Sequence, residues 1–208
     1  PFTNDLFSMK YQIFRPYDTK RTEFKLKESI GNVTVYKNTD KTALAYAMDD
    51  MVKTWDYQDY NPFYVQNDLA TSAFDVDELF HMIETEKPKL NNCKITSDNG
   101  DGEYVFENTS AQPDNMVFTI KSSKARQLYV HFDGSQVENT VIEKNGEQIL
   151  TGRLDSQIIY LGNVQKGDVI RIKMQLKQDD VMSGVVRLTA AELDEEAMEK
   201  LAQKMQEN

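Results

Sequence analysis

Alternating apolar and polar residues between positions 92 and 190 constrain the fold of this chain more than any other feature. Because successive side chains of a β-strand point to opposite faces, such alternation predicts strands with one buried and one wet face. The clearest run spans residues 168–177, where the apolar positions are Ile170, Ile172, Met174 and Leu176. Comparable runs recur about every 8–12 residues with polar turns between them, which is typical of an antiparallel sandwich or jelly roll.

Two further patterns in this region agree with that fold. The apolar positions of residues 127–132 are even-numbered, so we expect His131 on the wet face of its strand. Asn145-Gly146 separates two apolar runs, and this pair is the strongest short hairpin signal because both residues accept positive φ. The sequence therefore predicts a mainly β fold, with an antiparallel β-sandwich or jelly-roll-like domain at about residues 92–190.

The rest of the sequence predicts two flanking segments. We expect an N-terminal α+β segment at residues 1–91 and a C-terminal helix at residues 191–208. Short strands are expected in residues 1–50. Residues 51–72 are rich in aromatic and polar side chains without a clear period, so we expect an aromatic-rich loop there with at most one helical turn.

Capping patterns predict where the helices begin. Asp75 followed by Glu78 has the spacing of a capping box, so we expect a helix from Asp75 that ends before Pro88. Asp194 is expected to cap the C-terminal helix, because an aspartate side chain accepts hydrogen bonds from the first helical N–H groups.

The charge balance limits the partners. There are 34 acidic and 24 basic side chains, a net charge of -10. Nucleic-acid binding needs a basic surface that releases counterions, so we expect no nucleic acid as partner. The same balance disfavours peripheral docking on anionic lipid.

The chain has no segment that could cross a membrane and no start signal. It contains no apolar run near the roughly 18 residues that a spanning helix requires. It begins at Pro1, without an initiator Met, so we expect a piece of a longer protein. The single Cys93 excludes an internal disulfide and leaves the compartment open.

No catalytic or metal-binding residue is predicted. His81 and His131 each lack a second His or Cys two to four residues away, which zinc ligands usually have. Cys93 has no base that the sequence places beside it, and no serine lies in a Gly-x-Ser-x-Gly elbow. We therefore expect no metal, no cofactor and no catalytic group in this chain.

The acidic, glycine-rich residues 97–103 suggest calcium but fail the EF-hand pattern. If Gly102 takes position 6 of the loop, Asn108 falls at position 12, where a Glu is required. We expect a turn between two strands. A calcium site of another kind between Asp98 and Glu103 stays open.

Four aromatic residues form the one plausible recognition surface: Trp55, Tyr57, Tyr60 and Tyr64. They alternate with Asp and Asn, and sugar-binding surfaces combine ring faces that stack on C–H groups with polar tips that bond hydroxyls. The alternative is a long loop that its own rings pin to the domain.

Several short motifs, in this order, resemble the YfhO family of bacterial membrane proteins. Residues 4–11 resemble its N-D-L-L-G-V-K-Y passage, with Ser8 in place of the Gly. Val35-Tyr36-Lys37-Asn38 resembles its v-Y-e-N strand, with Lys37 in place of the acid. The N-P-F-x-x-Q-N signature is matched by Asn61, Pro62, Phe63, Gln66 and Asn67.

The resemblance implies a function that the residues alone do not show. Members of the family are multi-pass proteins similar to GT-C type glycosyltransferases, and some are linked to glycosylating lipoteichoic acid or related polymers of the Gram-positive cell envelope. By this resemblance we expect the chain to be a soluble region on the extracytoplasmic face of the cell membrane, without the catalytic loop and the transmembrane region of the family. The implied partner is a cell-envelope glycan or teichoic acid polymer.

The resemblance also divides the candidate residues by role. We expect Tyr36, Asn38, Asn61, Pro62, Phe63, Gln66 and Asn67 to be architectural. Trp55, Tyr57, Tyr60 and Tyr64 are the candidates for ligand contact. Two alternatives stay open for the chain, a free-standing carbohydrate-binding module and a purely structural interaction domain. A soluble hydrolase is a third, disfavoured by the missing motifs.

Overall fold

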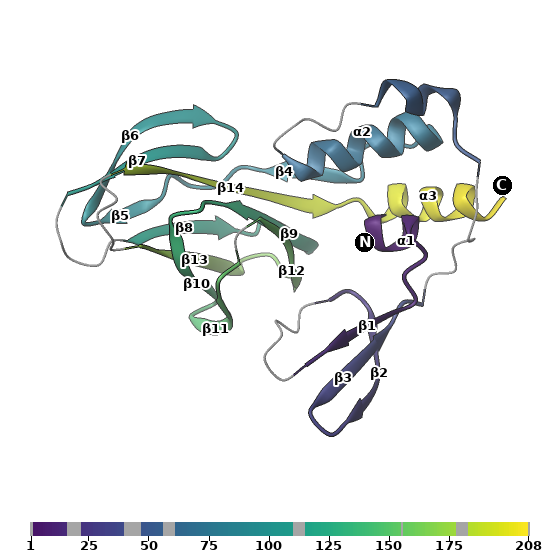
Figure 1. The fold of residues 1–208 in the computed structure, drawn as a ribbon, viewed down its shortest axis with the longest axis horizontal. Helices are drawn as coiled ribbons and strands as arrows, with labels where there is room; N and C mark the ends of the chain where they lie inside the picture. Colours follow the sequence, from purple (N-terminus) through teal and green to yellow (C-terminus); the bar gives the residue numbers. More distant parts are fainter. Residues whose placement is uncertain are drawn as a thin grey trace. The chain divides into compact units, whose positions relative to one another are not determined.

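The computed structural model describes residues 2–15, 22–39, 47–55, 61–109, 115–154, 156–177 and 183–207 (Figure 1). The chain divides into two compact units. The first unit comprises Pro1–His81 and Ala191–Asn208, and the second unit comprises Met82–Ala190.

The second unit is built from two antiparallel sheets. One sheet has the strand order β11-β10-β13-β8-β5 and the other β12-β9-β14-β7-β6, with β4 pairing β14. The strands are β4 (Phe80–Ile83), β5 (Lys89–Asn91), β6 (Cys93–Gly100), β7 (Glu103–Asn108), β8 (Asn115–Lys121), β9 (Arg126–Asp133), β10 (Val137–Lys144), β11 (Glu147–Gly152), β12 (Gln157–Val164), β13 (Val169–Leu176) and β14 (Ser183–Leu193). Phe80 and His81 at the start of β4 and the last three residues of β14 belong to the first unit. The predicted mainly antiparallel β fold is therefore confirmed.

The core of the second unit lies between the inward faces of the two sheets. Ile170, Ile172 and Met174 of β13 are fully buried, as the alternation predicts. They share one cluster with apolar side chains of β8, β9, β7 and β14. The β10–β11 hairpin turns at Asn145 and Gly146, which both have positive φ, so this prediction is also confirmed.

The prediction that His131 lies on a wet face is wrong. Strand β9 is buried on both faces, and His131 is only 8% exposed. Its neighbour Tyr129 on the same face is 1% exposed, and the ring of Tyr160 from β12 lies against it with centroids 5.0 Å apart. Alternation in sequence finds the core face of a strand, but it does not show whether other groups cover the opposite face.

The first unit combines helices with a small sheet. Strands β1 (Tyr11–Phe14), β2 (Lys25–Ile30) and β3 (Val33–Lys37) form a sheet in the order β1-β3-β2. The helical elements are α1 (Phe2–Leu6), the 3-10 helix η1 (Asp50–Thr54), α2 (Pro62–Phe74) and α3 (Glu195–Glu207). Asp194 accepts a hydrogen bond from the N–H of Ala197 at 2.9 Å, which confirms it as the cap of α3.

The predicted helix from Asp75 is wrong, and so is the predicted loop over residues 61–72. The helix is α2, and Asp75 lies at its C-terminal end with φ of 50°; strand β4 begins at Phe80. Helix α2 begins at Asn61-Pro62, a strong start signal because Asn caps and proline has no N–H to lose at the first position. The side chains that it buries include Phe63, Asn67, Ala70 and Phe74, which is helical spacing.

Among the described residues, no helix is both long enough and apolar enough to cross a membrane.

Candidate functional site

The motif residues Asn61, Pro62, Phe63 and Gln66 build the first turn of α2. The Asn61 side chain accepts a hydrogen bond from the N–H of Phe63 at 3.1 Å. The Gln66 side-chain amide donates to the carbonyl of Pro62 at 3.0 Å. Phe63 is fully buried, and its ring lies 5.1 Å from the ring of Phe80. These contacts fix where the helix starts and which face it buries.

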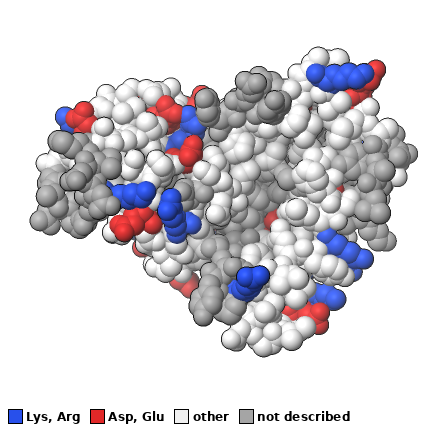
Figure 2. All heavy atoms as spheres, viewed as in Figure 1, with Lys and Arg blue, Asp and Glu red and all other residues white. Residues whose placement is uncertain are grey.

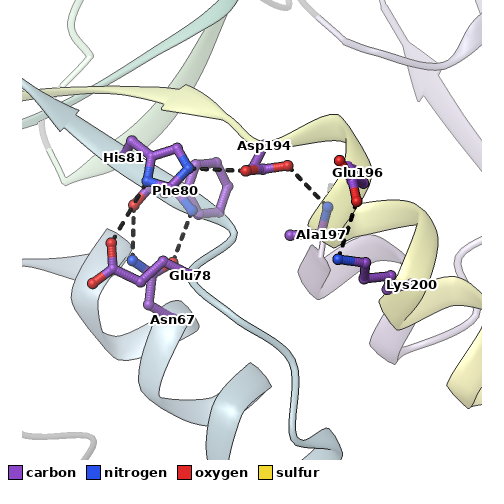
Figure 3. A network of polar contacts seen from close by, with 8 residues as sticks. All are labelled: Asn67, Glu78, Phe80, His81, Asp194, Glu196, Ala197 and Lys200. Carbon is purple, nitrogen blue, oxygen red and sulfur yellow. Dashed lines mark hydrogen bonds and ion pairs between the residues drawn. The ribbon is translucent and has the colours of Figure 1, made fainter.

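Asn67 joins α2 to β4. Its Nδ2 donates to the carbonyl of Phe80 at 2.8 Å, and its Oδ1 accepts from the N–H of Phe80 at 2.9 Å (Figure 3). The amide therefore bonds both backbone groups of one residue, as a neighbouring strand does. Because Asn67 is only 6% exposed, each of these hydrogen bonds satisfies a polar group that is buried away from solvent.

His81 and Asp194 join β4 to the start of α3. The Nε2 of His81 lies 2.9 Å from Oδ2 of Asp194, and because a carboxylate only accepts, this nitrogen carries the hydrogen. The N–H of Asp194 also donates to the carbonyl of Leu79 at 2.8 Å. Hydrogen bonds from the Ala197 N–H and then from the His81 ring hold the pKa of Asp194 below its ordinary value.

The other ring nitrogen of His81 lies 3.6 Å from Oε2 of Glu78. Both nitrogens of the imidazole thus face carboxylates (Figure 3), an arrangement that orients the ring and connects three segments. Among the described residues, no group of three or more His, Cys, Asp or Glu is placed to hold a metal ion.

Lys204 ties α3 to the end of α2. Its Nζ donates to the carbonyls of Phe74 and Asp75 at 2.6 and 2.9 Å. A cation is favourable there because the last carbonyls of a helix carry partial negative charge. The signature residues at one end of α2 and Lys204 at the other therefore fix the helix within the first unit.

The two other motifs of the resemblance meet at Asp5 and Asn38. The Asn38 side chain donates to Oδ1 of Asp5 at 2.7 Å, and both residues are buried. The N–H of Asn38 donates to the carbonyl of Lys10 at 2.9 Å. Tyr36 of β3 packs edge-on against Phe14, with ring centroids 5.5 Å apart.

Ser8 ends helix α1 in the left-handed region, with φ of 50°. The N–H of Ser8 donates to the carbonyl of Asp5 at 2.9 Å, and that of Met9 donates to the carbonyl of Asn4 at 2.7 Å. This pair of bonds is the Schellman motif, whose left-handed position glycine occupies most easily. The Gly of the family passage therefore has a physical reason at this position.

Of the four aromatic candidates, the structure describes Trp55 and Tyr64. Tyr57 and Tyr60 lie outside the described residues. Trp55 is half-buried, and its Nε1 donates to the carbonyl of Val65 at 3.1 Å. Tyr64 lies in the first turn of α2 and is 39% exposed. The indole is thereby held at the same turn of the helix that carries Tyr64.

The expected turn between two strands is present but shorter than residues 97–103: it lies at Asp101-Gly102 of the β6–β7 hairpin, and residues 97–100 belong to β6. Asp98 pairs with Lys87 at 3.3 Å, and Glu103 contacts both Asn99 and Arg187. The hydrogen bond from Asn99 lowers the pKa of Glu103. A Cβ on Gly102 would lie 1.9 Å from the carbonyl oxygen of Leu188, so only glycine fits there. The carboxylates of Asp98 and Glu103 are thus engaged by neighbouring protein groups.

Sequence reasoning missed the contacts that hold the first unit together. His81 and Asp194 are 113 residues apart, and no local pattern connects them. Asn67 did carry a signal, because a buried amide four residues after Phe63 on one helix face requires partners. That signal could be used only after α2 itself had been recognised.

Comparison with known proteins identifies a family. A sequence model described as bacterial membrane protein YfhO matches residues 1–208. Among curated proteins, none matches this chain.

Several solved structures are distantly similar to part of this chain. A family 35 carbohydrate-binding module from Clostridium thermocellum is 9% identical with a TM-score of 0.34, over 52% of this chain and 98% of that one. The carbohydrate-binding module CBM36 in complex with calcium and xylotriose is 15% identical with a TM-score of 0.31, over 54% and 100%. A Podospora anserina GH26-CBM35 beta-(1,4)-mannanase is 13% identical with a TM-score of 0.32, over 53% of this chain and 27% of that one. The ligands in these names belong to those proteins.

Proposed function

We propose, from the premise that this chain belongs to the YfhO family of bacterial membrane proteins, that it is a domain on the extracytoplasmic face of a multi-pass protein. Its role in this proposal is to hold the cell-envelope glycan or teichoic acid polymer that the membrane-embedded part glycosylates. The chain described here has no turnover of its own.

The observation that carries the proposal is the fixed presentation of aromatic rings at the start of α2. Asn61, Gln66 and Asn67 hold that turn by hydrogen bonds to backbone groups. The indole of Trp55 is bonded to Val65, and Tyr64 stays 39% exposed. Rings held in place bind sugar faces without losing much conformational freedom on binding, which favours affinity.

The groups with catalytic potential have architectural contacts, which supports a binding role. His81 lies between Glu78 and Asp194. Cys93 is buried, with its Sγ 3.6 Å from the carbonyl oxygen of Asn115. A nucleophile needs exposure and an adjacent base, and these two side chains are used instead to join neighbouring segments.

A titration with lipoteichoic acid fragments and neutral glycans tests the proposal. Trp55 is the only tryptophan, so its fluorescence reports binding near α2. Tyr64→Ala is expected to weaken binding roughly tenfold, since losing one stacked ring corresponds to about 1.4 kcal/mol. The matched control is Phe7→Ala, which removes an exposed aromatic ring, 67%, directly after helix α1. Equal loss in both variants, or no binding by the wild type, would refute the aromatic site.

One observation favours a second candidate, a purely structural interaction domain. The indole N–H of Trp55 is bonded to a backbone carbonyl and the ring is half-buried, so the ring also pins η1 to α2. In that case Trp55→Phe lowers the stability of the first unit while no glycan binds to the wild type.

A further inference from the structure

The sheet β1-β3-β2 exposes apolar side chains that a folded domain normally covers. Ile13 is 64% exposed, Ile30 is 65% exposed, and Tyr11 is 42% exposed. Every residue of β2 is exposed. Scattered apolar residues on a surface need no explanation, but several on one small sheet indicate a surface that contacts something.

The strand register places these side chains on one face in ordered rows. Tyr11 lies opposite Lys37, and Lys37 lies opposite Lys25, so all three share a face. The next row on that face contains Ile13, Val35 and Glu28.

Towards the β2–β3 turn, Ile30 lies opposite Val33. The face thus changes from lysines and a tyrosine at one end to aliphatic side chains at the hairpin tip.

Cations surround the tyrosine at the polar end of this face. The Nζ of Lys27 lies 5.0 Å from the centre of the Tyr11 ring, and that of Lys10 lies 5.8 Å from it. Tyrosine and lysine side chains at such a boundary keep apolar parts in an apolar phase and polar tips at the water interface.

The charge of this part of the chain is opposite to that of the whole. Residues 10–15 and 22–37 carry five basic and two acidic side chains, a net charge of +3. The whole chain carries -10. Basic side chains therefore outnumber acidic ones in this small sheet and the residues next to it, the reverse of the chain as a whole. Figure 2 shows basic and acidic side chains interspersed over the face in view.

We propose that this sheet face docks on the surface of an anionic lipid bilayer, with the β2–β3 tip towards the acyl chains and the lysine row at the phosphates. Charge complementarity favours this occupant over a second copy of the chain, because two basic faces repel. The aliphatic tip favours a bilayer over a dissolved polyanion, which offers no apolar phase. The whole-chain charge, which disfavours lipid docking, hides this local reversal of sign.

Vesicle binding of the purified chain tests the proposal. The wild type is expected to bind vesicles that contain phosphatidylglycerol, to bind pure phosphatidylcholine far more weakly, and to dissociate at high salt. The triple change Lys25→Gln, Lys27→Gln and Lys37→Gln is expected to lower partitioning on the order of a hundredfold, about fivefold for each lysine. Ile13→Ser with Ile30→Ser is expected to lower it as well.

The matched control removes the same charge elsewhere, through Lys94→Gln, Lys121→Gln and Lys173→Gln. Circular dichroism melting shows whether each variant is folded. The proposal is supported if the control triple variant binds vesicles like the wild type, while the sheet triple variant and the isoleucine variant lose binding. The proposal is overturned if the wild type does not bind vesicles, or if both triple variants lose vesicle binding equally. It is also overturned if the variant with both isoleucines changed binds vesicles normally while soluble poly(glycerol phosphate) displaces the protein from them. None of these results depends on whether Trp55 and Tyr64 bind glycan.

Discussion

The side-chain amide of Asn67 bonds both the N–H and the carbonyl of Phe80, so one residue of α2 completes the backbone hydrogen bonding of a strand 13 positions away. Asn67 lies on the buried face of its helix, beside Phe63 and Ala70. This contact explains why an amide occupies a position where the pattern of the helix requires an apolar side chain.

We expect Asn67→Ala to destabilise the first unit by roughly 2–6 kcal/mol, because it removes two buried hydrogen bonds at about 1–3 kcal/mol each. Urea unfolding followed by Trp55 fluorescence measures this. Ser72→Ala on the same helix is the control, since Ser72 is only half-buried. A change in midpoint no larger than that of the control would contradict the role assigned to Asn67.

We expect Ser8→Gly to stabilise the protein by about 0.5–1 kcal/mol. Ser8 has φ of 50°, a conformation that costs a residue with a side chain about 1–2 kcal/mol. Glycine avoids this cost, but it also raises the conformational entropy of the unfolded chain, which offsets part of the stabilisation. Thermal unfolding measures the difference. Ser29→Gly, in strand β2, is the control and is expected to be neutral or destabilising. Stabilisation by both changes would show that the backbone argument is wrong.

His131 makes stability depend on pH near neutrality. Burial, and then the positive charge of Arg187, lower its pKa below the ordinary value of 6.5, while Asp133 opposes them. The folded state therefore binds a proton less readily than the unfolded state. The contribution of neutral His131 is fully present above pH 6.5 and is lost as pH falls through the folded pKa.

Urea midpoints at pH 7.5 and pH 5.5 measure this effect. The urea midpoint of the wild type is expected to be lower at pH 5.5 than at pH 7.5. This difference is expected to be smaller in His131→Gln and unchanged in His81→Gln, which keeps the buried ring of His131. If His131→Gln leaves the difference between the two urea midpoints unchanged, groups other than His131 cause the pH dependence.

Asp168 is expected to support the acid stability of the sandwich. Hydrogen bonds from the Gln165 N–H and the Asn145 amide, then from Lys144, lower its pKa from 3.8 to about 2. Because the folded pKa is depressed, this contribution is present above pH 3.8 and is lost as pH falls towards 2.

Asp168 also joins two turns, because Asn145 bonds both its carboxylate and the N–H of Val169. We expect Asp168→Asn to move the acid-unfolding midpoint to higher pH, as followed by circular dichroism. Glu138→Gln removes one acidic charge from an exposed position of β10 and serves as the control. If the acid-unfolding midpoint moves equally in both variants, the change in net charge alone explains the shift, and the hydrogen bonds of Asp168 do not.

The sequence predicted the sandwich because its signal is local and repeated. In β13 each second residue, from Ile170 to Leu176, is apolar and buried, so one strand reports its own orientation. The Asn145-Gly146 turn is likewise determined by its own backbone angles. Such features need no knowledge of the rest of the chain.

The first unit was harder to predict because its determinants are distant or ambiguous. Asp75 and Glu78 have the spacing of a helix start, yet Asp75 ends α2 and Glu78 faces His81. His81 meets Asp194, which is 113 residues away. The aromatic residues near Trp55 obscured the Asn61-Pro62 start signal, because rings next to polar residues fit a loop as well as a helix.

A nuclear magnetic resonance titration with lipoteichoic acid fragments tests the central claim most directly. The single indole N–H, that of Trp55, is bonded to Val65 and gives one resolved signal beside the proposed contact surface. The proposal predicts saturable shifts of this signal and of the backbone N–H groups of Phe63 and Tyr64, which Tyr64→Ala weakens. Shifts confined to the second unit, or none at saturating polymer, would contradict it.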